Sequence, residues 1–350
     1  MKHIIGGKPQ TAQAGVHRVC VDENSAGQRL DNFLMRQLKG VPKTHVYRII
    51  RSGEVRVNKG RAQADTRLEL GDEVRLPPVR VSERATEKAQ AMAERGTTAP
   101  ARDFAVLFED EAFLAIDKPA GVAVHGGSGV SFGVIEQLRM ARPDAKFLEL
   151  VHRLDRETSG ILLVAKKRSA LKNLQDQFRE RETGKTYLAL VKGVWPAKRK
   201  VLDKPLHKYL LPDGERRVKV VAKDDPDGMP SLTLVKVRAC TDAAAAAPTD
   251  ATGGVSLLEV TIKTGRTHQI RVHLASEGHP IVGDDKYGDF ELNKLLARGD
   301  AKAPVLKRMF LHAWRLQCAH PVTGKGMVLQ APLPSELAGF LRQVLPQTTV

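Results

Sequence analysis

Hydrophobic residues between positions 28 and 53 recur with the period of an α-helix. The first apolar stripe consists of Leu30, Phe33, Leu34 and Leu38. The second consists of Val46, Ile49 and Ile50. Gly40 is suited to end the first helix, Pro42 fits the first turn of the second, and Gly53 is suited to end it. Alternating apolar residues at 55–57 and 74–76 then predict two short strands. We therefore expect a small unit of two helices and a little sheet.

From residue 103 onward the pattern predicts many strands and only a few helices. Strands are expected at 105–108, 113–117, 161–165, 187–191, 231–237, 255–262 and 326–330. Helices are expected at 132–142, 169–180 and 336–344. Because no strand–helix–strand repetition is present, this order favours the α+β class over a doubly wound parallel sheet.

Changes in composition suggest how the chain is divided. Residues 1–20 have no usable periodicity, so a flexible tail is expected over 1–26 and the small unit over 27–80. The segment 81–102 is rich in Ala, Glu, Arg and Thr and reads as a linker, and residues 103–350 form a larger domain. The low-complexity stretch 243–254 joins two expected strands, which predicts an exposed hairpin insertion.

The charge balance points to a polyanionic partner. The 350 residues include 56 Lys and Arg against 40 Asp and Glu, a formal net charge of +16. Such an excess suits nucleic acid or an anionic membrane surface. No apolar run approaches the roughly 20 residues that span a bilayer, and nothing near the start reads as a secretory signal. We expect nucleic acid as the partner and no association with a membrane.

The cysteines and histidines give no sign of a disulfide framework or a metal site. Cys20, Cys240 and Cys318 are odd in number and far apart, which fits a reducing compartment and predicts a cytoplasmic location. His268 and His273 are five residues apart, a spacing that places them on different faces of a helix and on opposite faces of a strand. No metal is expected.

The segment 152–160, HRLDRETSG, places a carboxylate between two arginines just before the apolar strand 161–165. Positive neighbours favour the ionised form of Asp155, and loops anchored on sheets often carry chemistry. A capped turn closed by a salt bridge explains the same residues without any chemistry. Composition and spacing leave both interpretations open.

The wider phrase is similar to a known family. The segment belongs to HRLDRETSGILLVAKK, which resembles the HRLD motif of the RluA-type pseudouridine synthases. Three further phrases follow the family's order: AIDKPAGVAVHGGSG, KTYLALVKG and TGRTHQIRVHLASEGHPIVGDDKYGD. The N-terminal QRLDNFLMRQLKGVPKTHVYRIIRSGEVRVNKGR resembles an S4 RNA-binding module. The resemblance covers nearly the whole chain, and LKGVPK, VRLPPVRV and FLELVHRLD look like the RluC branch.

The resemblance implies a fold, a reaction and a set of site residues. The larger domain would carry a mixed, largely antiparallel sheet. Uridines in large-subunit ribosomal RNA would be isomerised to pseudouridine, with no cofactor. By their places in the motifs, Asp155 would be the catalytic carboxylate and Arg271 would be its ion-pair partner. Tyr187 would pack on the uracil, and Arg153 would help hold the nucleotide out of its stack. The pair with Arg271 would keep Asp155 ionised and oriented, and Arg266 is the less favoured partner. The tandem acids of GDDKYGD would be architectural.

Two element assignments accompany these roles. Thr267 can cap a helix that carries Arg271 and ends at Gly278, although the apolar pattern alone fits a strand equally well. His152 is expected to be structural, bonded to the backbone near its turn.

In the S4-like unit, basic residues would grip RNA by its shape and its phosphates. These residues are Lys43, Arg48, Arg51, Arg56 and Lys59. The expected partner is large-subunit ribosomal RNA or its assembly intermediate, with transfer RNA second. Two other classes stay open: an assembly protein that binds RNA without catalysis, and a carboxylate hydrolase of nucleosides. No obligatory protein partner is expected, and the protein would be a monomer.

Overall fold

The computed structural model describes residues 15–22, 25–38, 41–79, 99–126, 132–241, 254–298 and 304–348. The chain forms two compact units, Met1–Ala99 and Pro100–Val350. No helix within these described ranges has the length and apolar character needed to cross a membrane.

The first unit packs two helices on a three-stranded sheet. Its elements are β1 (His17–Cys20), α1 (Leu30–Gln37), α2 (Lys43–Arg51), β2 (Arg56–Val57) and β3 (Glu73–Leu76). The strand order is β1-β3-β2, with both pairs antiparallel. The two predicted apolar stripes form one core, in which Leu30, Phe33, Val46 and Ile49 are almost completely buried. Both predicted helices and the small sheet are confirmed.

The predicted tail is wrong for residues 17–22. Strand β1 pairs with β3 from His17 opposite Leu76 to Cys20 opposite Glu73. The next residue, Val21, is buried in the core of the unit. The strand escaped notice because three of its four residues are exposed, so its sequence has no buried alternation. The backbone ladder with β3, rather than side-chain burial, holds it. Residues 1–14 lie outside the described ranges.

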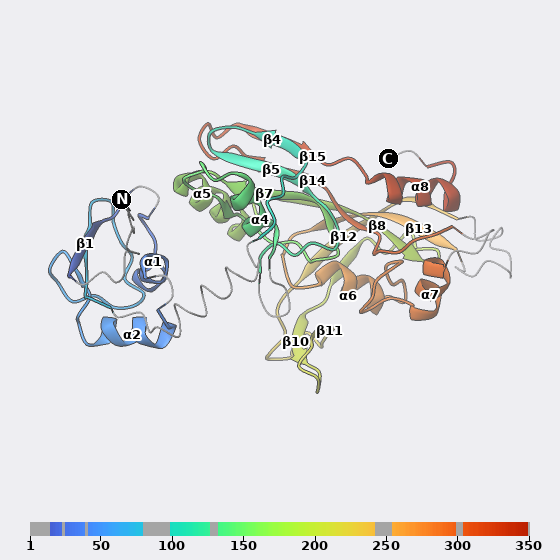
Figure 1. The fold of residues 1–350 in the computed structure, drawn as a ribbon. Helices are drawn as coiled ribbons and strands as arrows, with labels where there is room; N and C mark the ends of the chain where they lie inside the picture. The colour runs from blue at the N-terminus through green and yellow to red at the C-terminus, as the bar shows by residue number, and fades with distance from the viewer. Residues whose placement is uncertain are drawn as a thin grey trace, which may run out of the picture. The chain divides into compact units, whose positions relative to one another are not determined.

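The second unit is built on one large mixed sheet (Figure 1). Its strands are β4 (Val106–Glu109), β5 (Phe113–Lys118), β6 (Glu149–Leu150), β7 (Ser159–Ala165), β8 (Gly184–Lys192), β9 (Val201–Asp203), β12 (Leu232–Cys240), β13 (Val255–Ile262), β14 (Leu311–Ala319) and β15 (Gly326–Gln330). The order is β4-β5-β7-β14-β8-β13-β12-β9, with β15 beside β14 and β6 beside β7. Among the described strands only β7 and β14 run parallel, so the mixed, largely antiparallel α+β fold is confirmed.

Helices cover the sheet on both faces. They are α4 (Val134–Ala141), α5 (Arg168–Arg179), α6 (Gln269–Ser276), α7 (Phe290–Arg298) and α8 (Ser335–Val344). In β7, Ile161 and Leu163 pack in the cluster that contains α5, whereas Leu162 and Val164 pack in the cluster that contains α4. A strand buried on both faces reads as a continuous apolar run, which is why ILLVA identified β7 in the sequence.

Other strands escaped the sequence pattern. Strand β14 is central and buried, but a bulge between Ala313 and Arg315 breaks its alternation. The hairpin of β10 (Leu206–Leu210) and β11 (Arg216–Val220) is basic and largely exposed, and it stands away from the main sheet in Figure 1. Strands β12 and β13 pair antiparallel, as a hairpin requires. The insertion between them lies outside the described residues up to position 253.

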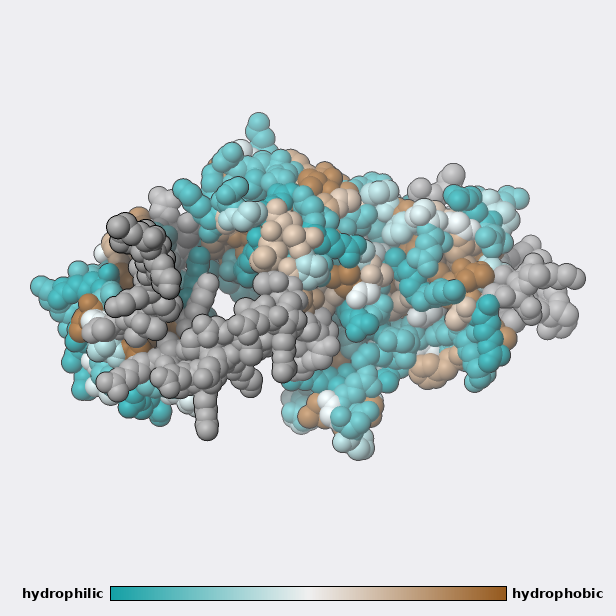
Figure 2. Space-filling model, viewed as in Figure 1, coloured by the Kyte–Doolittle hydropathy of each residue, from teal (hydrophilic) through white to brown (hydrophobic). Residues whose placement is uncertain are grey.

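The visible surface of the second unit is mostly hydrophilic, with hydrophobic residues in small separate groups (Figure 2). Single exposed apolar residues such as Leu210 and Phe290 are ordinary on protein surfaces.

Candidate active site

The loop that carries Asp155 connects β6 to β7. The amide N–H of Thr158 donates a 3.1 Å hydrogen bond to the carbonyl of Asp155, which closes a tight turn. Gly160, the second residue of β7, has a φ of 108°. A Cβ at Gly160 would lie 2.3 Å from the carbonyl oxygen of Ala313, so only glycine lets β7 approach β14 here. This close approach explains the glycine that ends the segment HRLDRETSG.

Lys118 fixes the other side of the loop. Its side chain is fully buried, and Nζ donates to the carbonyls of Pro119, Val122 and Arg156 at 2.8, 2.8 and 3.0 Å. Burial lowers the pKa of Lys118 to about 7. Because Arg156 directly follows Asp155, this ammonium group ties the loop to the end of β5.

The helix α6 is anchored by Gln269. Its Oε1 accepts hydrogen bonds from Thr264 Oγ1 (2.7 Å) and from the amide of Arg266 (3.1 Å). Its Nε2 donates to the carbonyl of Leu232 at 3.0 Å. These bonds fasten the start of the helix to the edge of β12.

The helix itself was predicted, but its cap was not. The residue at the N-cap is His268, in the left-handed conformation, rather than Thr267. His268 makes no side-chain hydrogen bond to the first turn of the helix, so α6 begins without a side-chain cap. The end of the helix agrees with the prediction, since Gly278 follows it with a φ of 82°.

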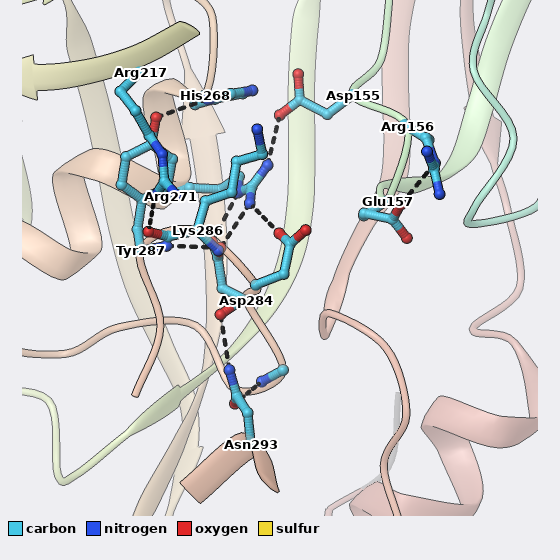
Figure 3. Close-up of polar contacts among 12 residues, drawn as sticks. Asp155, Arg156, Glu157, Arg217, His268, Arg271, Asp284, Lys286, Tyr287 and Asn293 are labelled. Atoms are coloured by element: carbon cyan, nitrogen blue, oxygen red, sulfur yellow. Dashed lines mark hydrogen bonds and ion pairs between the residues drawn. The ribbon is translucent and has the colours of Figure 1, made fainter. Parts of the chain in front are cut away.

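Arg271, on α6, is buried and surrounded by acids (Figure 3). Its Nε and Nη2 donate to the two carboxylate oxygens of Asp284 at 2.7 and 2.6 Å. Nη2 also donates to Asp285 at 2.9 Å, and Nη1 lies 3.8 Å from Oδ2 of Asp155. Burial alone would lower the pKa of Arg271, but the bonds and charges of Asp284, with Asp155 and Asp285, raise it above its usual range.

Asp284 is therefore the principal partner of Arg271, and Asp155 is the second. Oδ1 of Asp284 also accepts hydrogen bonds from the amides of Lys286 and Tyr287, at 2.8 and 3.0 Å. Burial by itself would raise the pKa of Asp284, but Arg271 and these amides lower it. The expected architectural role of this acidic segment is incomplete, because Asp284 also holds the guanidinium of Arg271. The sequence feature that could have indicated this contact is that GDDKYGD belongs to the same motif phrase as Arg271.

Tyr287 is a second residue that the sequence did not single out. Two guanidinium groups lie near its ring, with Arg271 at 5.3 Å and Arg217 at 5.7 Å from the ring centroid. Its hydroxyl accepts a 3.0 Å bond from the amide of Val218 and lies 2.8 Å from Nδ1 of His268. The hairpin β10–β11 is thus joined to the site.

Two adjoining cavities open at Asp155. The cavity of about 570 Å³ is the more polar of the two, and its lining includes Arg156, Arg266 and Lys286. The cavity of about 400 Å³ is more apolar and includes Tyr187, Phe178 and Leu311. Both are also lined by Arg153, Leu154, Asp155, Gly265, Arg266, His268 and Arg271. A flat ring fits the apolar cavity, and anionic groups fit the basic one.

The predicted site residues of the second unit meet at these cavities. Tyr187 lies on β8 and lines the apolar one, and Arg153 is exposed beside Asp155. Burial and then the charge of Asp155 raise the pKa of Tyr187, so its hydroxyl stays protonated at neutral pH. His152 accepts a 3.2 Å bond from the amide of Leu163 and stacks on Phe178, as a structural histidine would.

In the first unit, the predicted RNA-contacting residues lie on α2, in β2 and on the turn after β2. The side chains of Lys43, Arg48, Arg51 and Lys59 are exposed, and Arg56 is partly exposed. Within the part of the chain that the structure describes, none of the five forms an ion pair. Lys43, Tyr47 and Arg51 follow one another at spacings of four, so they share one side of α2.

One group of possible metal ligands is present among the described residues, and it lies outside the site. The side chains of His207, Asp225 and Asp227 bring their ligand atoms within 4.8 Å of one another. None of these residues lines either cavity at Asp155.

Comparison with known proteins identifies two families along the chain. Residues 112–276 match the RNA pseudouridylate synthase family, and residues 28–74 match the S4 domain. The chain is 49% identical over 335 residues to the ribosomal large subunit pseudouridine synthase C of Salmonella typhimurium, covering 96% of this chain and 98% of the relative. It is 48% identical to the protein of the same name from Escherichia coli K12, with the same coverage.

Solved structures show the same relationship. Human RNA pseudouridylate synthase domain containing 4 has a TM-score of 0.54 at 25% identity, covering 74% of this chain and 95% of that one. Human RNA pseudouridylate synthase domain containing 1 has a TM-score of 0.53 at 27% identity, covering 67% and 85%. With an S4 domain before the catalytic fold and half of its residues shared with these bacterial relatives, the chain belongs to the RluA family of RNA pseudouridine synthases.

Proposed function

We propose that this enzyme isomerises uridines of large-subunit ribosomal RNA, with Asp155 as the catalytic carboxylate. The relatives that match nearly the full chain carry that substrate in their names. The observation that carries the catalytic assignment is the meeting of Asp155, Arg271 and Tyr187 at one pair of cavities, from three distant segments.

The reaction needs little besides a carboxylate and a closed cavity. The N1–C1′ bond of the uridine breaks, the uracil turns within the site, and a C5–C1′ bond forms. The proton of C5 is lost and N1 gains one, so the product is an isomer of the substrate. An Asp carboxylate is a competent nucleophile at electrophilic carbon, and it can also accept a proton. Asp155 has one oxygen beside Arg271, and its side chain is 29% exposed, so it is open to a nucleotide.

The neighbours of Asp155 have complementary roles in this proposal. Arg271 steadies the carboxylate by charge, while its own position is set by Asp284. Tyr187 packs against the uracil in the apolar cavity. The exposed Arg153 fills the space that the target nucleotide leaves in the RNA, since extruding a stacked base costs a few kcal/mol.

The S4 domain is proposed to dock on a folded element of the ribosomal RNA. Its exposed cations contribute affinity through phosphates without reading sequence. We propose that the enzyme acts as a monomer in the cytoplasm, on ribosomal RNA that is still being assembled.

The test compares wild type with Asp155→Asn on large-subunit ribosomal RNA lacking pseudouridine. Pseudouridines are mapped by chemical modification, and release of tritium from C5-labelled uridine measures the rate. Wild type should convert specific uridines, and the Asn variant should convert none while it still binds RNA. Activity in the variant would refute the role of Asp155, and conversion confined to transfer RNA would refute the proposed substrate.

Two other functional classes give different results in the same assay. A protein that binds ribosomal RNA without catalysis would leave every uridine unchanged. A hydrolase would release free uracil, whereas isomerisation leaves the mass of the RNA unchanged.

A further inference from the structure

His268 has a backbone conformation that ordinary residues avoid. Its φ and ψ are 52° and 21°, in the left-handed region, at the N-cap residue just before α6. Histidine tolerates this region better than most side chains, but such conformations persist only where the surroundings enforce them, and they gather at functional sites. The adjacent Gln269, fastened to β12, supplies that enforcement.

The hydrogen bonds of Tyr287 favour one tautomer of His268. The amide of Val218 donates to the hydroxyl oxygen of Tyr287, and among the described residues Nδ1 of His268 is the one acceptor within reach of the hydroxyl hydrogen. We therefore assign the hydroxyl as the donor to Nδ1. Nδ1 is then an acceptor, and in a neutral imidazole the proton lies on Nε2. Burial, followed by the charges of Arg271 and Lys286, lowers the pKa of His268 despite Asp155, which favours this neutral form at pH 7.

The Nε2–H group is directed into the site. In Figure 3 the ring of His268 extends from Tyr287 toward the side of Asp155. His268 lines both cavities, the apolar one and the basic one. Within the described residues no protein group accepts a hydrogen bond from Nε2. A donor of fixed orientation therefore faces the space that the substrate occupies.

The position of His268 between the two cavities indicates which part of the nucleotide it contacts. If the uracil lies in the apolar cavity and the phosphates lie along the basic one, the ribose that joins them lies at their boundary, beside His268 and Asp155. The 2′-hydroxyl is the ribose group that is free to accept a hydrogen bond, and it is the group that distinguishes RNA from DNA.

We propose that His268 is a substrate-contacting residue, whose Nε2–H donates a hydrogen bond to the 2′-hydroxyl oxygen of the target uridine. This inference rests on the proposed function, because it assumes a uridine bound at Asp155. It assigns a role in sugar recognition that is separate from the roles of Asp155, Arg271 and Tyr187.

The test pairs two substitutions with two substrates. His268→Asn favours the same left-handed backbone and keeps an acceptor for Tyr287, but it has no group at the position of Nε2. His268→Gln places an amide donor near that position. A uridine that wild type converts is mapped first. It is then replaced by 2′-deoxyuridine in an otherwise identical RNA, and rates are measured with enzyme in excess.

One neutral hydrogen bond predicts losses of about 3- to 10-fold. Wild type should lose this factor on the deoxy substrate, and His268→Asn should lose it on the ribo substrate. The Asn variant should lose nothing further on the deoxy substrate, since the contact is already absent. His268→Gln should recover most of the ribo rate. Unchanged unfolding midpoints exclude a general effect on folding.

Results that refute the role of His268 can be distinguished from results that refute the proposed function. Additive losses, or a full rate of His268→Asn on the ribo substrate, overturn the assignment of His268 while wild type remains active. A wild type that converts no uridine overturns the proposed function and this inference with it. If the Asn variant does not fold, Tyr287→Phe replaces it. That change removes the hydroxyl that fixes the tautomer and should reduce the penalty of the deoxy substrate, and an unreduced penalty counts against the contact.

Discussion

Arg271 donates two hydrogen bonds to Asp284, of 2.7 and 2.6 Å, while the nearest oxygen of Asp155 lies 3.8 Å from the same guanidinium. Both members of the closer pair are nearly inaccessible to water, whereas Asp155 is 29% exposed. The guanidinium is thus held by an acid that is closed to solvent, and its remaining edge faces the acid that is open to solvent. In the proposed function, this division would keep Arg271 in place when a nucleotide enters.

Asp284→Asn should therefore harm both folding and catalysis. The change leaves a buried guanidinium without its main counter-charge, and removing one partner of a buried pair typically costs about 3–5 kcal/mol. The free energy of unfolding, measured in denaturant, should fall by that order, and turnover should fall with it. Asp285→Asn is the matched control. Asp285 is 61% exposed, so its loss should cost at most about 1 kcal/mol. Equal effects of the two changes would contradict the assignment of Asp284 as the anchor.

Tyr187 should act mainly through its ring. Stacking of a base on an aromatic side chain is worth roughly 1–3 kcal/mol by alanine substitution, or about 5- to 150-fold in rate or affinity. Tyr187→Ala should lose that factor in single-turnover rate. Tyr187→Phe keeps the ring and should stay within about fivefold of wild type, by the same stacking scale. If Tyr187→Phe lost as much single-turnover rate as Tyr187→Ala, the hydroxyl rather than the ring would be the important group.

Neutralising the basic side of α2 should weaken RNA binding and its dependence on salt. Each phosphate contact contributes about 0.7–0.9 to the slope of log K against log salt. The triple change of Lys43, Arg48 and Arg51 to Ala should therefore reduce the slope by about two. The control Lys172→Ala alters an exposed lysine of α5 and should leave the slope as it is. The effect is measured by equilibrium binding to the ribosomal RNA from low to moderate salt. An unchanged slope in the triple variant would contradict the proposed contacts of these residues with RNA phosphates.

His312 should make the fold sensitive to acid. Burial lowers the pKa of His312 to about 4, with a further contribution from Arg308. Its Nδ1 accepts from Ser159 Oγ at 2.9 Å, and Ser159 in turn accepts from Arg308 at 2.7 Å, so this network needs the neutral imidazole. Between pH 6.5 and 4 the unfolded chain binds a proton here that the folded chain does not. Stability is therefore lost as the pH falls through this window, by about 3 kcal/mol in all.

The measurement is the free energy of unfolding against pH for wild type and His312→Gln. The Gln variant starts less stable, but its curve should be flatter by that amount between pH 6.5 and 4. Substitution of the exposed His17 in the same way should leave the slope of wild type unchanged. Parallel curves for wild type and His312→Gln would exclude the buried histidine as a source of the acid sensitivity.

The sequence determined those features that depend on local pattern. The two amphipathic helices of the first unit, the buried run ILLVA of β7 and the ordered motifs around Asp155 and Arg271 could all be found from neighbouring letters. Each follows from the geometry of a helix or strand or from a long phrase. The strands β1 and β14 were not found, because an exposed edge strand and a bulged central strand have no regular alternation.

Only the tertiary structure decided how the site is held together. Asp284 lies 13 residues after Arg271, and the local sequence does not indicate that these two charged side chains contact each other rather than solvent. The contact of Val218 with Tyr287 and of Tyr287 with His268 joins a hairpin, a loop and a helix end. Hydrogen bonds between distant segments form when the fold removes these groups from water, since a buried polar group must then find its partner within the protein.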